Sequence, residues 1–171
     1  MATTDSTNTA GARTADHVRR ANPMGAHVAT AGVVVFLIAT YLDWVSTDGE
    51  QSATGSGYET DTSIALVAFV GVGLAVALQY ALQRASGRQH RGLSLTALAV
   101  GIAAVLLSLG YIVDAPGAFE RGADLSPEIG AWIGLLGGIV WSVGAALLAK
   151  EPEGDDDRNA DHGRTQAHSA H

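Results

Sequence analysis

Long apolar stretches alternate with short charged segments along most of this chain. Four stretches of about twenty residues carry almost no charged side chain; they are residues 25–45, 63–83, 93–113 and 129–149. At the α-helical rise of about 1.5 Å per residue, each stretch would be about 30 Å long, which matches the hydrocarbon core of a bilayer. The pattern therefore predicts four transmembrane helices.

A soluble bundle is not favoured, because its helices would carry polar residues along one face. Residues 65–78 and 97–107 carry no charged side chain on any face. The predicted fold class is all-α: an integral membrane four-helix bundle over residues 24–150, with antiparallel, up-and-down helices. The polar segments 1–23 and 151–171 have the composition of disordered tails.

Basic residues lie in alternate polar segments, and this predicts the orientation of the helices. Arginines occur before residue 25, within residues 84–91 and after Lys150, whereas the first connection, residues 46–62, is acidic and has no basic residue. In the third connection, Arg121 is the one basic residue among acids. We therefore expect a plasma membrane protein with both termini in the cytoplasm and the first and third connections outside.

Acidic residues would then gather above one end of the bundle. Such a surface would attract cations or a basic partner domain, unless the acids only keep the connections soluble and enforce the topology. Asp43 and Asp114 lie close to predicted helix ends, where they either mark the boundary with water or share a cation. The acids of this predicted outer surface are Asp43, Asp48, Glu50, Glu59, Asp61, Asp114, Glu120, Asp124 and Glu128.

Small residues recur along the apolar stretches and predict how the helices pack. In lipid, close backbone approach and van der Waals contact drive helix association, and small side chains permit both. The alternative to packing inside the bundle is an interface between copies. The last stretch has a small residue at every fourth position, and two other stretches have shorter patches: Gly130, Gly134, Gly138, Ser142 and Ala146, then Gly73 with Ala77, and Gly101.

Aromatic residues lie near the ends of the stretches, where a ring buries its body and keeps its polar tip in water. We expect them to be interfacial anchors; they are Tyr41, Trp44, Tyr111, Trp132 and, at the inner end, Tyr80.

Local signals predict where the helices begin. Ser126 and Pro127 are typical of an N-cap and a first helical residue, and Asp61 is placed to cap the second helix. The first connection has room for a short hairpin around residues 54–58.

The rest of the composition offers little chemistry. The formal net charge of −7 comes from the tails and connections, and the absence of cysteine excludes disulfides, thiol catalysis and cysteine zinc sites. Polar side chains inside the stretches are few, with His27 and Gln79 near the inner ends. Acids and histidines in the C-terminal tail suit a solvated segment better than a metal site. We expect no cofactor, no metal and no nucleic acid partner.

The sequence Tyr41-Leu42-Asp43-Trp44-Val45-Ser46, followed by a polar connection and Gly57-Tyr58-Glu59, resembles a pattern in small four-span membrane proteins of high-GC bacteria. Most of those proteins have no assigned activity. The opening Gly130-Ala131-Trp132 of the glycine-rich last stretch is similar too. By topology the chain also resembles claudins, although its first outer connection lacks their cysteine pair. The resemblance implies a four-span fold and no functional residue.

These observations favour a non-enzymatic multi-pass membrane protein, either an accessory subunit or a structural and interaction module. Its expected partners are the lipid bilayer and other membrane subunits or further copies of itself. The alternative is a small transporter or channel formed by oligomerisation, although such a path needs polar lining. A membrane enzyme is the third hypothesis.

Overall fold

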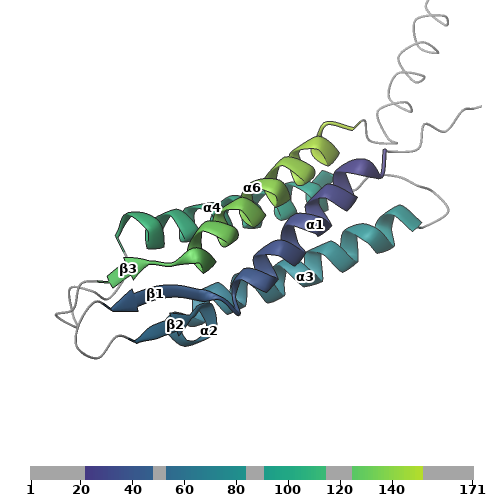
Figure 1. Ribbon diagram of the computed structural model, residues 1–171. Coiled ribbons are helices and arrows are strands. Elements are labelled where there is room, and N and C mark those ends of the chain that lie inside the picture. Colours follow the sequence, from purple (N-terminus) through teal and green to yellow (C-terminus); the bar gives the residue numbers. More distant parts are fainter. Residues whose placement is uncertain (1–21, 48–52, 84–90, 115–124, 152–171) are drawn as a thin grey trace, which may run out of the picture.

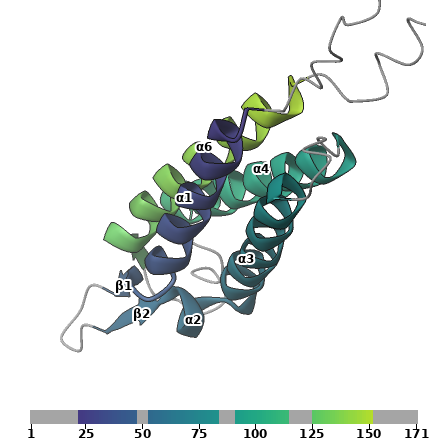
Figure 2. The ribbon, with the colours of Figure 1, turned by 90° about the vertical axis from the view of Figure 1, so that its right-hand side faces the viewer.

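The computed structural model describes residues 22–47, 53–83, 91–114 and 125–151. Four main helices pack side by side, and a small sheet and one helical turn cover one end of them (Figure 1). Around the bundle, each helix contacts the next in the order α1, α6, α4, α3 (Figure 2). The helices are α1 (Met24–Ala39), α3 (Thr62–Gln83), α4 (Arg91–Val113) and α6 (Ile129–Ala149), with the short α2 (Gly57–Thr60) beside the sheet.

Helices α3, α4 and α6 are each long and apolar enough to cross a membrane. Helix α1 is equally apolar but has only 16 residues, which gives a length of about 24 Å. Large apolar side chains cover the outside of the helices, and many are half exposed or more, such as Leu66, Leu106 and Leu136. A continuous apolar exterior of this kind is unusual for a soluble monomer. The structure therefore supports a membrane location.

The prediction of a first helix over residues 25–45 was wrong at its end. Helix α1 ends at Ala39, and Asp43–Thr47 form strand β1. The N–H groups of Tyr41 and Leu42 donate to carbonyls only three residues back, at 3.1 Å each, so the last turn tightens before the chain changes direction. Trp44 and Val45 are buried in the strand, and so their apolar character extended the hydropathy signal past the true helix end.

The chain is not purely all-α, because the first and third connections form a three-stranded sheet. Strand β1 lies in the middle and pairs antiparallel with β2 (Thr54–Ser56) and with β3 (Leu125–Pro127). Strand β2 leads directly into α2, so the predicted hairpin is formed by β1 and β2 and not within residues 54–58.

The predicted span 129–149 is confirmed by α6, but the predicted N-cap and first helical residue were wrong. Ser126 and Pro127 belong to strand β3, and the extended Glu128 is the N-cap of α6. Strand β3 pairs with β1 alone, and proline is tolerated in such an edge strand because its missing N–H costs no ladder bond on the open side.

Helices α1 and α6 make the closest helix pair, and they run antiparallel. A methyl group added at Gly25 would lie 2.8 Å from the backbone nitrogen of Leu148, and one at Gly137 would lie 2.6 Å from that of Phe36. Contact positions alternate in steps of four and three along both helices, as in a coiled-coil seam. We call this contact the glycine seam; its facing pairs are Gly25 with Leu148, Ala29 with Gly144, Gly32 with Trp141, and Phe36 with Gly137.

The predicted small residues of the last stretch face mainly helix α4. A methyl group at Gly138 would lie 3.0 Å from the backbone nitrogen of Val105, and one at Gly101 would lie 2.8 Å from the hydroxyl of Ser142. Gly134 faces Trp44 and Ser108, Gly130 faces Asp43 and Trp44, and Ala146 is half-buried. Helix α6 therefore uses two small faces, one toward α4 and one toward α1.

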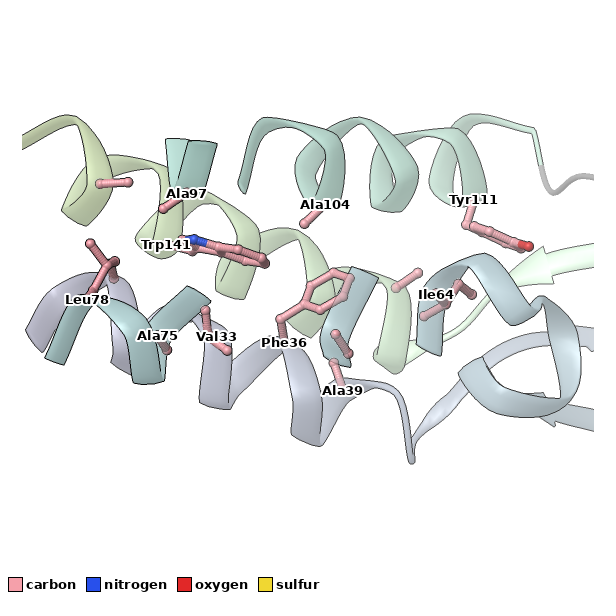
Figure 3. Close-up of a cluster of buried hydrophobic side chains, with 14 of the residues drawn as sticks. Val33, Phe36, Ala39, Ile64, Ala75, Leu78, Ala97, Ala104, Tyr111 and Trp141 are labelled. Atoms are coloured by element: carbon pink, nitrogen blue, oxygen red, sulfur yellow. The ribbon is translucent and has the colours of Figure 1, made fainter. Parts of the chain in front are cut away.

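The packing predicted for Gly73 was wrong within this chain, because Gly73 is exposed and nothing lies within 4 Å of an added methyl group. Ala77, four residues on, is only half-buried. Helix α3 instead faces the bundle through Gly71, where a methyl group would lie 2.6 Å from the indole of Trp141. That indole fills the centre of the bundle, next to Phe36 (Figure 3).

The glycine seam predicts that one added methyl group lowers the stability of the fold at a seam position but not at an exposed glycine. Gly32→Ala would place its Cβ inside the backbone of Trp141, so we expect a loss of stability of about 1–3 kcal/mol, as for overpacked cores. Gly73→Ala adds the same methyl group in open space and should leave stability unchanged or slightly higher. Thermal unfolding of both variants in one detergent, followed by circular dichroism, measures the difference. Equal midpoints would contradict the seam.

Candidate functional site

The sheet and the short helix α2 form a cap over one end of the helices (Figure 1). This sheet cap consists of residues 43–47, 54–60 and 125–128. It joins two connections that are far apart in the sequence, because β1 pairs with both β2 and β3. It also contains or adjoins most of the described residues that the sequence marks as a candidate outer surface.

Trp44 fastens the sheet cap to the helices. Its side chain is fully buried, and its indole N–H donates a 2.7 Å hydrogen bond to the carbonyl of Ala39 at the end of α1. The same carbonyl also accepts the backbone N–H of Leu42 at 3.1 Å, so it has two donors. The ring also packs edge to face against Tyr111 at 5.5 Å and Phe36 at 6.2 Å between centroids. Trp44 thus ties the sheet to the end of α1 and fills the space beneath it.

The anchor role predicted for Trp44 and Tyr111 was wrong, because Trp44 is fully buried and Tyr111 is 1% exposed. Hydropathy places both rings at helix ends but cannot show that the chain turns back and covers them. Tyr41, Tyr80 and Trp132 are exposed, so their anchor role remains a prediction.

Asp61 links the cap to the start of α3 and to α4. Its carboxylate accepts hydrogen bonds from the backbone N–H of Ser63 at 2.8 Å and from the hydroxyl of Tyr111 at 3.1 Å. The Ser63 backbone N–H is the main cause that lowers the pKa of Asp61, with smaller help from the two hydroxyls, while partial burial acts in the opposite direction. The predicted capping role of Asp61 is found.

Glu59 holds the helical turn α2 in place. Its carboxylate accepts hydrogen bonds from the backbone N–H of Ser56 at 3.1 Å and from the Ser56 hydroxyl at 2.9 Å. This local arrangement, a serine and a glutamate three residues apart, is typical of a helix start. The backbone bond is the larger cause that lowers the pKa of Glu59.

Glu128 joins the third connection to the first. Its side chain accepts a 2.6 Å hydrogen bond from the hydroxyl of Ser46, and its backbone N–H donates to the carbonyl of Trp44 at 2.9 Å. Strand β3 is thereby held to β1 just before α6 begins.

The predicted outer acids thus divide into two kinds. Glu59, Asp61 and Glu128 make hydrogen bonds within the cap or to the helices. Asp43 and Asp114 are exposed, and no described residue hydrogen-bonds their carboxylates. Within the described ranges no three potential metal ligands come together. The other predicted acids lie outside the described residues: Asp48, Glu50, Glu120 and Asp124.

A second polar cluster lies at the opposite end of the helices, between α1 and α3. The amide nitrogen of Gln79 lies 3.0 Å from the hydroxyl of Thr30 and 3.2 Å from Nδ1 of His27. Sequence reasoning places His27 and Gln79 near the same membrane face but does not pair them. One signal in the sequence could have paired them. His27 and Thr30 lie near the start of one apolar stretch and Gln79 near the end of the next, and these two ends meet when the helices run antiparallel.

Comparison of the chain with protein-family models and with characterised proteins finds no match. The resemblance to small four-span membrane proteins, and the topological likeness to claudins, therefore stay expectations from the sequence.

The hydrogen bonds of Asp61 predict that acid weakens the fold. Because the pKa of Asp61 is lowered in the folded chain, its contribution to stability is complete above the ordinary carboxyl pKa and is lost as pH falls through the lowered value. We expect the unfolding temperature in detergent to fall between about pH 5 and pH 2. The decrease should be smaller in Asp61→Asn, which keeps an acceptor but has no charge to lose.

Asp114→Asn is the matched control, since no described residue hydrogen-bonds this carboxylate. It should follow the parent protein at every pH. An acid response of Asp61→Asn equal to that of the parent would show that these hydrogen bonds do not carry the pH dependence.

Proposed function

We propose that the protein is a non-enzymatic integral membrane protein, an accessory or interaction subunit that crosses the plasma membrane four times. In this arrangement both termini are cytoplasmic, and the sheet cap lies outside. The apolar exterior of the helices and the alternate placement of arginines support the proposal. Helix α1 is short for a span, but the three uncharged residues after it carry the chain on to the buried Trp44.

The observation that carries the proposal is the pairing of β1 with β3. It brings together the two connections that the charge pattern assigns to the outside. The N-terminal end of α1 and the C-terminal ends of α3 and α6, each next in sequence to a basic segment, lie at the opposite end of the helices (Figure 1). Charge and fold therefore divide the chain into the same two sides.

An interaction role suits the sheet cap because the cap is attached to the helices and exposed carboxylates lie at the same end of the bundle. Trp44 and Asp61 attach it to the helices, and Glu128 joins its strands β1 and β3. Asp43 and Asp114 lie exposed at the same end with no hydrogen bond from a described residue. A fixed surface with free carboxylates is suited to a partner with basic side chains, and such exposed pairing weakens as salt increases.

A channel through a single copy has no support in the described part of the chain. The middle of the bundle is filled by Trp141 and Phe36, and Trp44 closes its capped end. A conducting path needs polar lining or backbone dipoles, and the packed interior provides aromatic rings instead.

The topology is testable because the chain has no cysteine. Thr54 is exposed on the cap and Lys150 is exposed at the other end, so each can be replaced by a single cysteine. A membrane-impermeant maleimide should label Thr54→Cys in intact cells, and Lys150→Cys only after the cells are permeabilised. Labelling of both sites in intact cells, or the reverse pattern, would overturn the four-span topology.

The interaction role is testable by photo-crosslinking in native membranes. A photoreactive residue at Thr54 should give a protein adduct of defined mass, whereas one at Leu66, on the exposed apolar side of α3, should give lipid adducts. The double substitution of Asp43→Asn and Asp114→Asn should lower the Thr54 adduct yield, most clearly at low salt. No protein adduct at Thr54 would contradict the interaction role, and an unchanged yield would contradict the part assigned to the two acids.

A further inference from the structure

A groove of about 450 Å³ opens between α1 and α3, at the end of the helices opposite the sheet cap. Toward the middle of the helices its lining is aliphatic, with the exposed Val34 on α1 facing Val72 and Val76 on α3. Its outer part is polar and includes Gln79 and Gln83. From Val72 to Gln83 the groove follows about 16 Å of helix. Along the helices the lining of the groove therefore changes from apolar to polar, as a membrane changes from its hydrocarbon core to its headgroups.

The Gln79 amide leaves one hydrogen-bonding atom unused. The Thr30 hydroxyl donates to the carbonyl of Ala26 at 2.8 Å, so its oxygen accepts from the amide nitrogen of Gln79. The second N–H of that nitrogen faces Nδ1 of His27. Both donors of the amide are then used, and no described residue donates to its oxygen Oε1. An unmatched carbonyl oxygen in a largely aliphatic groove favours a ligand that brings a donor.

The size of the groove selects among apolar occupants. A helix from another copy is about 10 Å across with its side chains, so over 16 Å it would fill roughly 1,200 Å³. The groove has about 450 Å³, which lies within the range of small-molecule sites, about 300–1,000 Å³. A single hydrocarbon chain is narrow enough to enter. In a four-span protein this part of the exterior faces lipid, and lipid acyl chains are hydrocarbon chains of this kind.

We propose that the groove binds one chain of a membrane amphiphile whose head carries a hydroxyl group. The chain lies between Val34 and Val76, and the hydroxyl donates to Oε1 of Gln79. This inference rests on the proposed four-span topology, which places the groove in the cytoplasmic leaflet. Gln79 then lies about 6 Å from the end of α3, where chain and headgroup meet.

The test compares two probes that share one chain. 1-Monooleoylglycerol carries hydroxyl groups, and methyl oleate has the same acyl chain and none. The full-length protein is purified in an amine-oxide detergent, because sugar detergents carry hydroxyls, and its unfolding temperature is followed as each probe is added. A ligand that binds the folded state raises this temperature. We expect half-maximal stabilisation at about three- to tenfold lower concentration for monooleoylglycerol, as one added hydrogen bond predicts.

Two substitutions separate the groove from general lipid effects. Gln79→Leu should remove the preference for monooleoylglycerol and leave the response to methyl oleate. Val76→Trp should fill the groove and abolish the response to both probes, with Val34→Trp as a second blocking variant on the facing helix. Leu66→Trp is the matched control, because Leu66 and Val76 are similarly exposed on α3, at 61% and 64%, and Leu66 lies outside the groove.

Equal responses of the parent protein to the two probes would overturn the hydroxyl recognition. A full response in both blocking variants would overturn the groove as the site. Cysteine labelling reports the topology without any ligand, so a wrong topology and a wrong assignment of the groove give different results.

Discussion

The rest of the structure depends on the backbone contact between α1 and α6. Side chains are absent at Gly25 and Gly32 on one helix and at Gly137 and Gly144 on the other, so the two backbones touch. In lipid such contact replaces the hydrophobic effect as the source of helix association. With the backbones this close, Trp141 occupies the centre of the bundle against Gly71. A second small face of α6, around Gly138 and Ser142, packs against α4.

The sheet cap follows from how α1 ends. Thr40 and the two residues after it tighten the last turn, and Trp44 then returns beneath the sheet to bind the carbonyl of Ala39. Gly130 and Gly57 leave the room that its ring needs. Of three carboxylates in the predicted charged surface, Asp61 bonds to α3 and α4, whereas Glu59 and Glu128 accept hydrogen bonds within the cap. The cap is therefore an extension of the helix packing, and Asp43 is the acid within these described segments that no described residue hydrogen-bonds.

Hydropathy predicted the four apolar helices because their side chains are apolar on every face, but it could not separate Trp44 and Val45 from the helix before them. A strand with buried residues has the same apolar composition. The four-residue spacing identified Gly134 and Gly138, which face α4. It missed the glycine seam, where steps of four and three alternate and the partner positions lie on a distant segment. The acids were visible as charge, whereas their hydrogen-bond donors depend on the folded path of the chain.

The glycine seam pairs the first and the last of the described helices. During synthesis, α1 is therefore made well before its main partner, and strand β1 is made before β3. The small-residue face of α1 has no complementary surface until α6 emerges, so the native arrangement cannot close from partial chains. Contacts between such distant segments carry the largest loop-closure cost. Docking of β3 and α6 is thus the step that completes both the sheet and the packed interior.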